Sequence, residues 1–222
     1  NASNYNTAVG YAAGTAVTSG LENTLIGGNA GAAITSGAYN TALGYGALAS
    51  EDAHGKNVAI GRSALYSQNA GADAYNIAIG YYAGVNVSTG IQNVCIGGLA
   101  GDALTTGSKN VAIGIAALST EDADHYSTAV GAYALETQNA GADAHNTALG
   151  YFAGNAISTG VKNTTIGSQA GDILATGYNN IVIGYNADAS AVDVNNEITL
   201  GDSNISALRC QVTSITSLSD KR

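Results

Sequence analysis

Hydrophobic and polar positions alternate in a five-residue motif that recurs along most of the chain, for example as Asn76-Ile77-Ala78-Ile79-Gly80. A polar residue opens the motif, a β-branched residue, a mostly small residue and a large aliphatic residue follow, and glycine closes it. Side chains of a strand alternate between its two faces, so the two larger residues share one face. We expect short strands whose larger side chains fill a coil and whose small residue lets a neighbouring chain approach closely.

The motif returns at regular intervals, and four successive intervals make up one unit of a larger repeat. Three of the four intervals are equal and the fourth is slightly longer, as the closing glycines show: Gly10, Gly27, Gly44, Gly61, Gly80, Gly97, Gly114, Gly131, Gly150, Gly167, Gly184 and Gly201. A short, sustained period is typical of solenoids. The sequence therefore predicts an all-β fold, a parallel β-solenoid (β-roll) of about twelve rungs of about 17–19 residues, on the order of 55 Å long.

Each rung also carries one position for a second wall of the coil. In two rungs of each larger repeat unit an aliphatic residue follows the glycine at a distance of seven, as Val17 and Ile34 do. In the other two rungs of the first and second units a leucine lies at a distance of four from the glycine, and the later position is polar: Glu51, Gln68, Glu121 and Gln138. We expect each rung to form a second short strand there.

Asparagine opens the motif in ten of twelve copies, and equivalent residues of a solenoid stack about 4.8 Å apart. Such a column can link its amides from rung to rung and satisfy backbone groups of the turns. We expect a structural ladder, formed by Asn6, Asn23, Asn40, Asn57, Asn76, Asn93, Asn110, Asn146, Asn163 and Asn180.

Composition and charge narrow the function. The net charge of −9 and only seven Lys and Arg disfavour nucleic-acid binding. The chain has no apolar run long enough to cross a membrane. Cys95 and Cys210 lie far apart and predict no disulfide framework. We expect one rod at 1–202, followed at 203–222 by a C-terminal strand and a junction to a further domain.

A core this thin, bordered by a column of alanine, predicts contact with other chains. A closed ring of identical interfaces removes exposed sheet surface. We therefore expect a homotrimer.

The repeated Asn-Val-Ala-Ile-Gly strands, as at 57–61 and 110–114, resemble the head repeats of trimeric autotransporter adhesins over residues 6–201. That resemblance implies a trimeric, left-handed parallel β-roll. The period of the present rungs is slightly longer than that of those heads, and this departure affects the shape of the coil.

Residues 196–212, with Ser-Leu-Ser-Asp-Lys-Arg at 217–222, resemble the junction to the C-terminal intramolecular chaperone of bacteriophage tail spikes and fibres. In that family the chaperone trimerises the chain and then cuts itself off between a serine and an aspartate. The resemblance assigns the cleavage junction to Ser219 and Asp220.

Several side chains are candidates for chemistry. Acids and histidines gather in the third and fourth rungs of each unit: Glu51, Asp52, His54, Asp73, Glu121, Asp122, Asp124, His125, Asp143 and His145. Repeated acidic collars around a trimer could bind Ca²⁺, but their spacing matches no metal motif, and solvated surface loops are the better interpretation. We expect no metal site and no cofactor.

Tyrosines follow the motif glycine at five positions, namely Tyr11, Tyr45, Tyr81, Tyr151 and Tyr185. Aromatic rings at a turn usually pack, and exposed rings also bind sugars. They are candidates for contact with a host surface glycan; a protein receptor is the other candidate partner.

The sequence thus predicts a non-enzymatic, trimeric shaft of a bacteriophage tail fibre, part of the extracellular virion, with a candidate role in host attachment. One alternative is the head of a bacterial trimeric adhesin. Another is an ice-binding solenoid with flat arrays of threonine, since Thr opens the strand in six rungs. A carbohydrate-active enzyme is a third alternative and would need a carboxylate pair in a groove. A Ser, His and acid set of the kind that other enzymes use does not recur along the chain.

Overall fold

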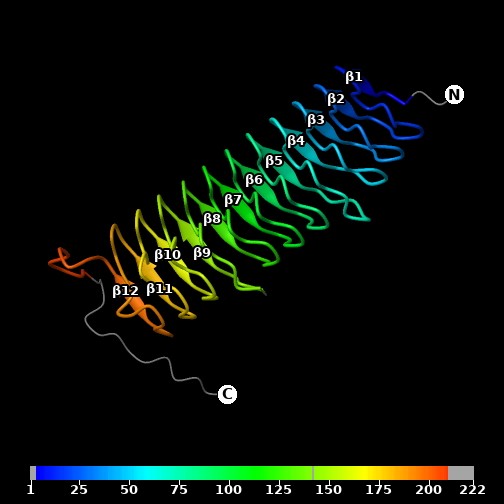
Figure 1. Cartoon of the computed structure of the whole chain (residues 1–222). Helices are drawn as coiled ribbons and strands as arrows, with labels where there is room; N and C mark the ends of the chain where they lie inside the picture. Colours follow the sequence, from blue (N-terminus) through cyan, green and yellow to red (C-terminus); the bar gives the residue numbers. More distant parts are fainter. Residues whose placement is uncertain (1–3, 142, 210–222) are drawn as a thin grey trace.

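The computed structural model describes residues 4–141 and 143–209, and within them it forms a single parallel sheet of twelve three-residue strands (Figure 1). Consecutive strands are neighbours, so the chain winds as a β-solenoid of about 11 turns. The predicted fold class is confirmed. The strands are β1 Thr7–Val9, β2 Thr24–Ile26, β3 Thr41–Leu43, β4 Val58–Ile60, β5 Ile77–Ile79, β6 Val94–Ile96, β7 Val111–Ile113, β8 Thr128–Val130, β9 Thr147–Leu149, β10 Thr164–Ile166, β11 Ile181–Ile183 and β12 Ile198–Leu200.

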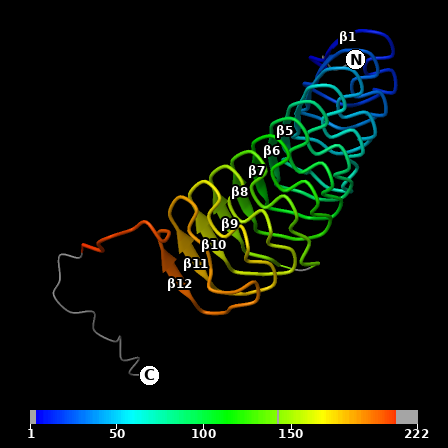
Figure 2. The same cartoon turned by 60° about the vertical axis from the view of Figure 1, so that its left-hand side comes forward.

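The strands pair in strict register, and each motif position lies beside the same position of the next rung. Val58 pairs with Ile77 across one of the two longer intervals, and Thr128 pairs with Thr147 across the other. The additional residues of these intervals are therefore accommodated in the loops. Figure 2 shows the result as a rod with its strands along one side and the connecting loops wrapped round the other.

The expected second strand is not formed in the described rungs, where the second wall is irregular. Its backbone still bonds from rung to rung, for example where the amide of Gly14 donates to the carbonyl of Ala30 at 3.0 Å. In the first ten rungs the fourth position after the motif glycine has positive φ, whether it holds Gly14 (φ 58) or Leu48 (φ 52). This left-handed residue interrupts an extended strand there.

The predicted orientation of the strands is wrong. In β2 to β11 the middle residue is the buried one, while the residues on either side are half-buried or exposed. The alanines therefore face the coil interior, and the Thr, Val, Ile and Leu side chains that we expected inside face outward.

The thickness of the coil explains this reversal. The second wall supplies a large side chain from nearly every rung, including the fully buried Ile34, Leu48 and Leu104, so the sheet can supply only a small one. Leu25 is a large middle residue, and glycines make room for it: a Cβ on Gly31 would lie 2.7 Å from a methyl of Leu25. The expectation of one apolar second-wall side chain per rung is thus confirmed for these residues.

The opening asparagines bond in two directions. Asn93 Oδ1 accepts the backbone amide of Asn110 in the next rung at 2.9 Å, and its Nδ2 donates to the carbonyl of Gly107 at 2.8 Å. The first bond joins neighbouring rungs, and the second closes the rung that Asn93 begins. The same pair of bonds is made by Asn6, Asn23, Asn76 and Asn163.

At the C-terminal end, residues 203–209 leave the last coil without forming a strand (Figure 1). Ser219 and Asp220, the candidate cleavage junction, lie outside the described residues, as does Cys210. No helix suited to crossing a membrane occurs in the described segments.

Candidate functional site: an apolar sheet face and two buried polar clusters

The outward side of the sheet is an apolar face, which we define as the first and third residues of strands β1 to β12. None of these 24 positions is charged: six are Thr, and the other eighteen are Val, Ile or Leu. Leu43 and Leu149, in β3 and β9, are 42% and 48% exposed. A continuous apolar surface of this extent is rare on a monomeric soluble protein and marks an interaction site.

The threonines of this face lie in two blocks. Thr7, Thr24 and Thr41 stack on consecutive rungs, as do the three at 128, 147 and 164. Their side chains lie on the outward side, contrary to our expectation. Val, Ile and Leu fill the third position beside them in every rung.

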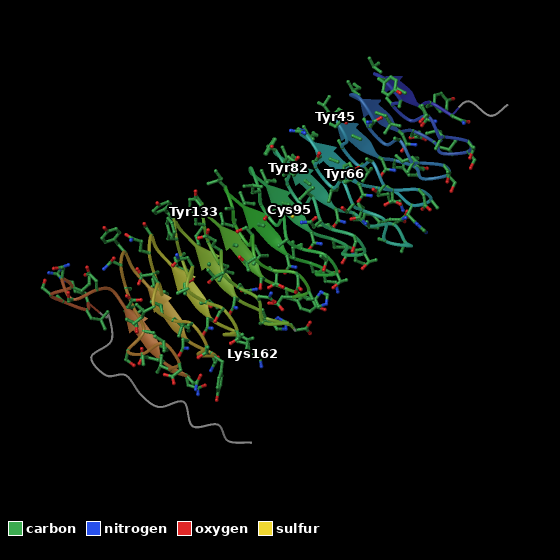
Figure 3. The ribbon with its side chains drawn as sticks, in the orientation of Figure 1. Tyr45, Tyr66, Tyr82, Cys95, Tyr133 and Lys162 are labelled. Carbon is green, nitrogen blue, oxygen red and sulfur yellow. The ribbon has the colours of Figure 1, made fainter. Side chains whose placement is uncertain are left out.

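The five tyrosines that follow the motif glycine are all exposed. Arg62 lies 5.9 Å from the ring centre of Tyr45, 6.0 Å from that of Tyr81 and 5.6 Å from that of Tyr82. In the next unit Phe152 stacks on Tyr133 at 4.8 Å. Figure 3 shows Tyr45 and Tyr133 along the edge where the strands end and Lys162 at the opposite edge.

The expectation that these acidic residues lie in solvated loops is wrong for three of them. Glu51, Glu121 and Asp124 are fully buried, together with Gln68 and Gln138. The two Glu and two Gln occupy the position that carries Val17 or Ile34 in other rungs, and this position points into the coil. The sequence contained that signal, because the polar residues replace an inward aliphatic at a fixed spacing.

These side chains form two equivalent clusters, one in each of the first two units of the larger repeat. The first polar cluster is Glu51, His54, Asn57 and Gln68. The second polar cluster is Glu121, Asp124, Ser127 and Gln138. At its second and third positions the first cluster has His and Asn where the second has Asp and Ser.

The second polar cluster is closed by direct hydrogen bonds. Gln138 Nε2 donates to Ser127 Oγ at 2.8 Å and to Glu121 Oε2 at 3.2 Å. The other oxygen of Glu121 accepts the amide of Asp124 at 2.6 Å. Burial, followed by a hydrogen bond to the carboxyl of Asp124, raises the pKa of Glu121 to about 8. The carboxyl of Glu121 therefore keeps its proton to a higher pH than an ordinary glutamate does.

The first polar cluster begins in the same way but is not closed. Glu51 Oε1 accepts the amide of His54 at 3.2 Å, and Gln68 Oε1 accepts from Asn76 Nδ2 at 2.7 Å. Four buried atoms of the cluster have no partner among the described residues, namely Glu51 Oε2, His54 Nδ1, Asn57 Nδ2 and Gln68 Nε2. Burial raises the pKa of Glu51 above its usual range.

One group of side chains could hold a metal ion. Ligand atoms of Glu51, Asp52 and His54 all lie within 4.8 Å of one another, and among the described residues this is the one group of three His, Cys, Asp or Glu that converges in this way. The nearby Asp73 is engaged elsewhere, since it pairs with Lys56 at 2.6 Å.

The remaining candidates have structural partners. His125 Nδ1 accepts the amide of Ser108 at 2.8 Å, and the ring of His145 stacks on Tyr126 at 4.9 Å. Cys95 is a free thiol at the inward middle position of β6, where burial raises its pKa to about 12.

Comparison with known proteins returned no match among protein-family models, curated proteins or solved structures. The class of the protein accordingly comes from its architecture. The chain is a parallel β-solenoid, a fold compatible with a fibre repeat protein.

Proposed function

We propose that this chain is a shaft segment of a trimeric, non-enzymatic fibre, and that the fibre is a bacteriophage tail fibre with a role in host attachment. The apolar sheet face carries the first part of this proposal. Eighteen aliphatic residues in two columns along one side of the rod would be unfavourably hydrated in a single chain. Burial against other copies removes that cost.

Three parallel copies account for the shape of this face. Each strand is three residues long, so the face is a narrow strip that runs the length of the rod. Three such strips facing a common axis form a closed ring of identical contacts, and every rung contributes equally. The outward aliphatic residues thus take over the role that we had given to alanine, and the expected assembly is unchanged.

A charged substitution on the face tests the assembly. Ile79→Lys places an ammonium group on the apolar sheet face in β5, where a single chain leaves Ile79 partly open to water. In a trimer three such charges would be buried near one axis, which is strongly unfavourable. We expect dissociation or a large loss of thermal stability in sedimentation and melting experiments.

Ile173→Lys is the matched control, because Ile173 is 42% exposed but lies outside the strands. Its mass in solution and its melting temperature should stay close to those of the unmodified chain. Equal behaviour of the two variants would contradict a role for the sheet face in assembly.

The assignment to a phage rests on the resemblance of residues 196–222 to a chaperone junction, and the adhesin head remains its nearest rival. The coding sequence downstream of Arg222 distinguishes them. A chaperone domain there supports the tail fibre, whereas coiled-coil heptads followed by a membrane anchor support the adhesin.

An ice-binding solenoid is a second candidate, favoured by one observation. The threonines of β1, β2 and β3, and those of β8, β9 and β10, are stacked and face outward. Thermal hysteresis and shaped ice crystals in dilute protein solution would support this function. Absence of both would exclude it and leave the threonines as part of an interface.

A further inference from the structure

We propose that the first polar cluster, together with Asp52, binds one divalent transition-metal ion such as Zn²⁺. Glu51, Asp52 and His54 supply the ligand atoms, which already lie within 4.8 Å of one another. Two atoms bound to one ion at about 2.1 Å lie at most about 4.2 Å apart, so modest side-chain rotations bring them into range. This site is independent of the number of chains in the assembly.

The unpartnered atoms point to a ligand at this place. Glu51 is fully buried, yet within the described part of the chain its Oε2 has no hydrogen-bond partner, and the buried Nδ1 of His54 has none either. A buried carboxylate oxygen left in this state is costly. A carboxylate oxygen and an imidazole nitrogen are both ligand atoms that Zn²⁺ binds, and bonds to the ion would offset that cost.

The second polar cluster is closed by hydrogen bonds among its own side chains, without a ligand. There Asp124 replaces His54, and Gln138 Nε2 donates directly to Ser127 Oγ and to Glu121 Oε2. In the first cluster the equivalent Gln68 Nε2 makes no such bond to a described residue. The unpartnered amide group therefore occurs in the cluster that contains the histidine and not in the cluster that contains Asp124.

The chemistry of the ligands selects the ion. Two carboxylates balance a divalent charge, and an imidazole nitrogen favours a transition metal over Ca²⁺, which prefers oxygen ligands. The amide oxygens of Asn57 and Gln68 accept bonds from Asn76, so their NH₂ groups are the parts left to face the site. These NH₂ groups can donate to the oxygen of a metal-bound water or hydroxide.

Calorimetric titration of the EDTA-treated, dialysed chain with ZnCl₂ near pH 7 tests the proposal. We expect saturable binding of one ion per chain and a higher melting temperature in zinc, because the ion binds the folded state. Glu51→Gln and His54→Asp should each weaken zinc binding by about tenfold or more. His54→Asp should fold normally, since the second cluster carries Asp at that position.

His145→Ala is the control for adventitious zinc binding, because His145 is an exposed histidine outside the cluster. It should bind zinc as the unmodified chain does. The proposal is overturned if the folded chain shows no one-to-one binding at millimolar zinc, or if Glu51→Gln and His54→Asp bind as tightly as the unmodified chain. A crystal structure grown in zinc that shows only a water molecule between Glu51 and His54 would also overturn it.

Discussion

The glycine that closes each strand motif occupies a position that no other residue fits. Gly97 has a φ of 132°, and a Cβ there would lie 2.6 Å from the carbonyl carbon of Gly114 in the next rung. Both the backbone conformation and the close approach of two rungs exclude a side chain. We expect Gly97→Ala to lower the free energy of unfolding, measured by urea titration, by about 3 kcal/mol.

Gly98→Ala is the matched control for that urea titration. The Cβ of this variant would meet only the carbonyl oxygen of Tyr81, at 4.0 Å, and the backbone has no positive φ at Gly98. Its stability should stay within about 0.5 kcal/mol of the unmodified chain. Equal losses in the two variants would contradict this account of the glycine column.

The asparagine column makes a similar prediction at a polar position. Asn93→Ala leaves the amide of Asn110 and the carbonyl of Gly107 without their side-chain partner inside the coil. Two unsatisfied buried groups should cost about 2–4 kcal/mol in chemical denaturation. Asn86→Ala, at an exposed asparagine that bonds the carbonyl of Asp102, should cost less than about 1 kcal/mol.

At the scale of one strand, the sequence predicts where each strand begins and ends and how it pairs with its neighbours. It does not predict which side of the strand faces the coil interior. A period of two assigns residues to two faces of the strand but does not say which face is buried. The prediction placed the face with the larger side chains inside. The physical limit is the narrow coil, because Leu48 from the second wall leaves room only for a small residue such as Ala42. The glycines that oppose Leu25 contained this information.

At the scale of one rung, the same reasoning explains the missed polar clusters. Glu121 replaces an inward aliphatic residue, yet its charge suggested a solvated loop. Which buried polar atoms have partners depends on side-chain geometry, and no spacing in the sequence gives it. Gln68 and Gln138 are identical in type and differ only in their partners.

The second polar cluster makes the stability of the chain depend on pH. The pKa of Glu121 is about 8 in the folded chain, against an ordinary value of 4.5. Because the folded value is the higher one, this group stabilises the fold fully below about pH 4.5, and the contribution is lost as pH rises towards 8. We expect the urea midpoint to fall between pH 5 and pH 8.

Glu121→Gln keeps the shape of the side chain and removes the titrating group. Its free energy of unfolding should change less over the same pH range, by about 1 kcal/mol or more. Glu22→Gln, at an exposed carboxylate, should retain the dependence of the unmodified chain. A Glu121→Gln variant with the full pH dependence would show that another group is responsible.

At the scale of the whole molecule, the regular return of the motif was sufficient to predict a parallel solenoid, because each rung repeats the same bonds to the next. Assembly is a different kind of property. It depends on which side chains face outward, and the orientation of β2 to β11 supplies that information. The apolar sheet face is the feature on which the proposed fibre assembly rests.

Sedimentation equilibrium of the unmodified chain at several concentrations tests the central claim most directly. Three chains facing one axis give a mass three times the 22.0 kDa of one chain, with no dependence on concentration over the working range. A mass of 22.0 kDa at every concentration would show that the apolar sheet face is stable in water by itself, and would contradict the account.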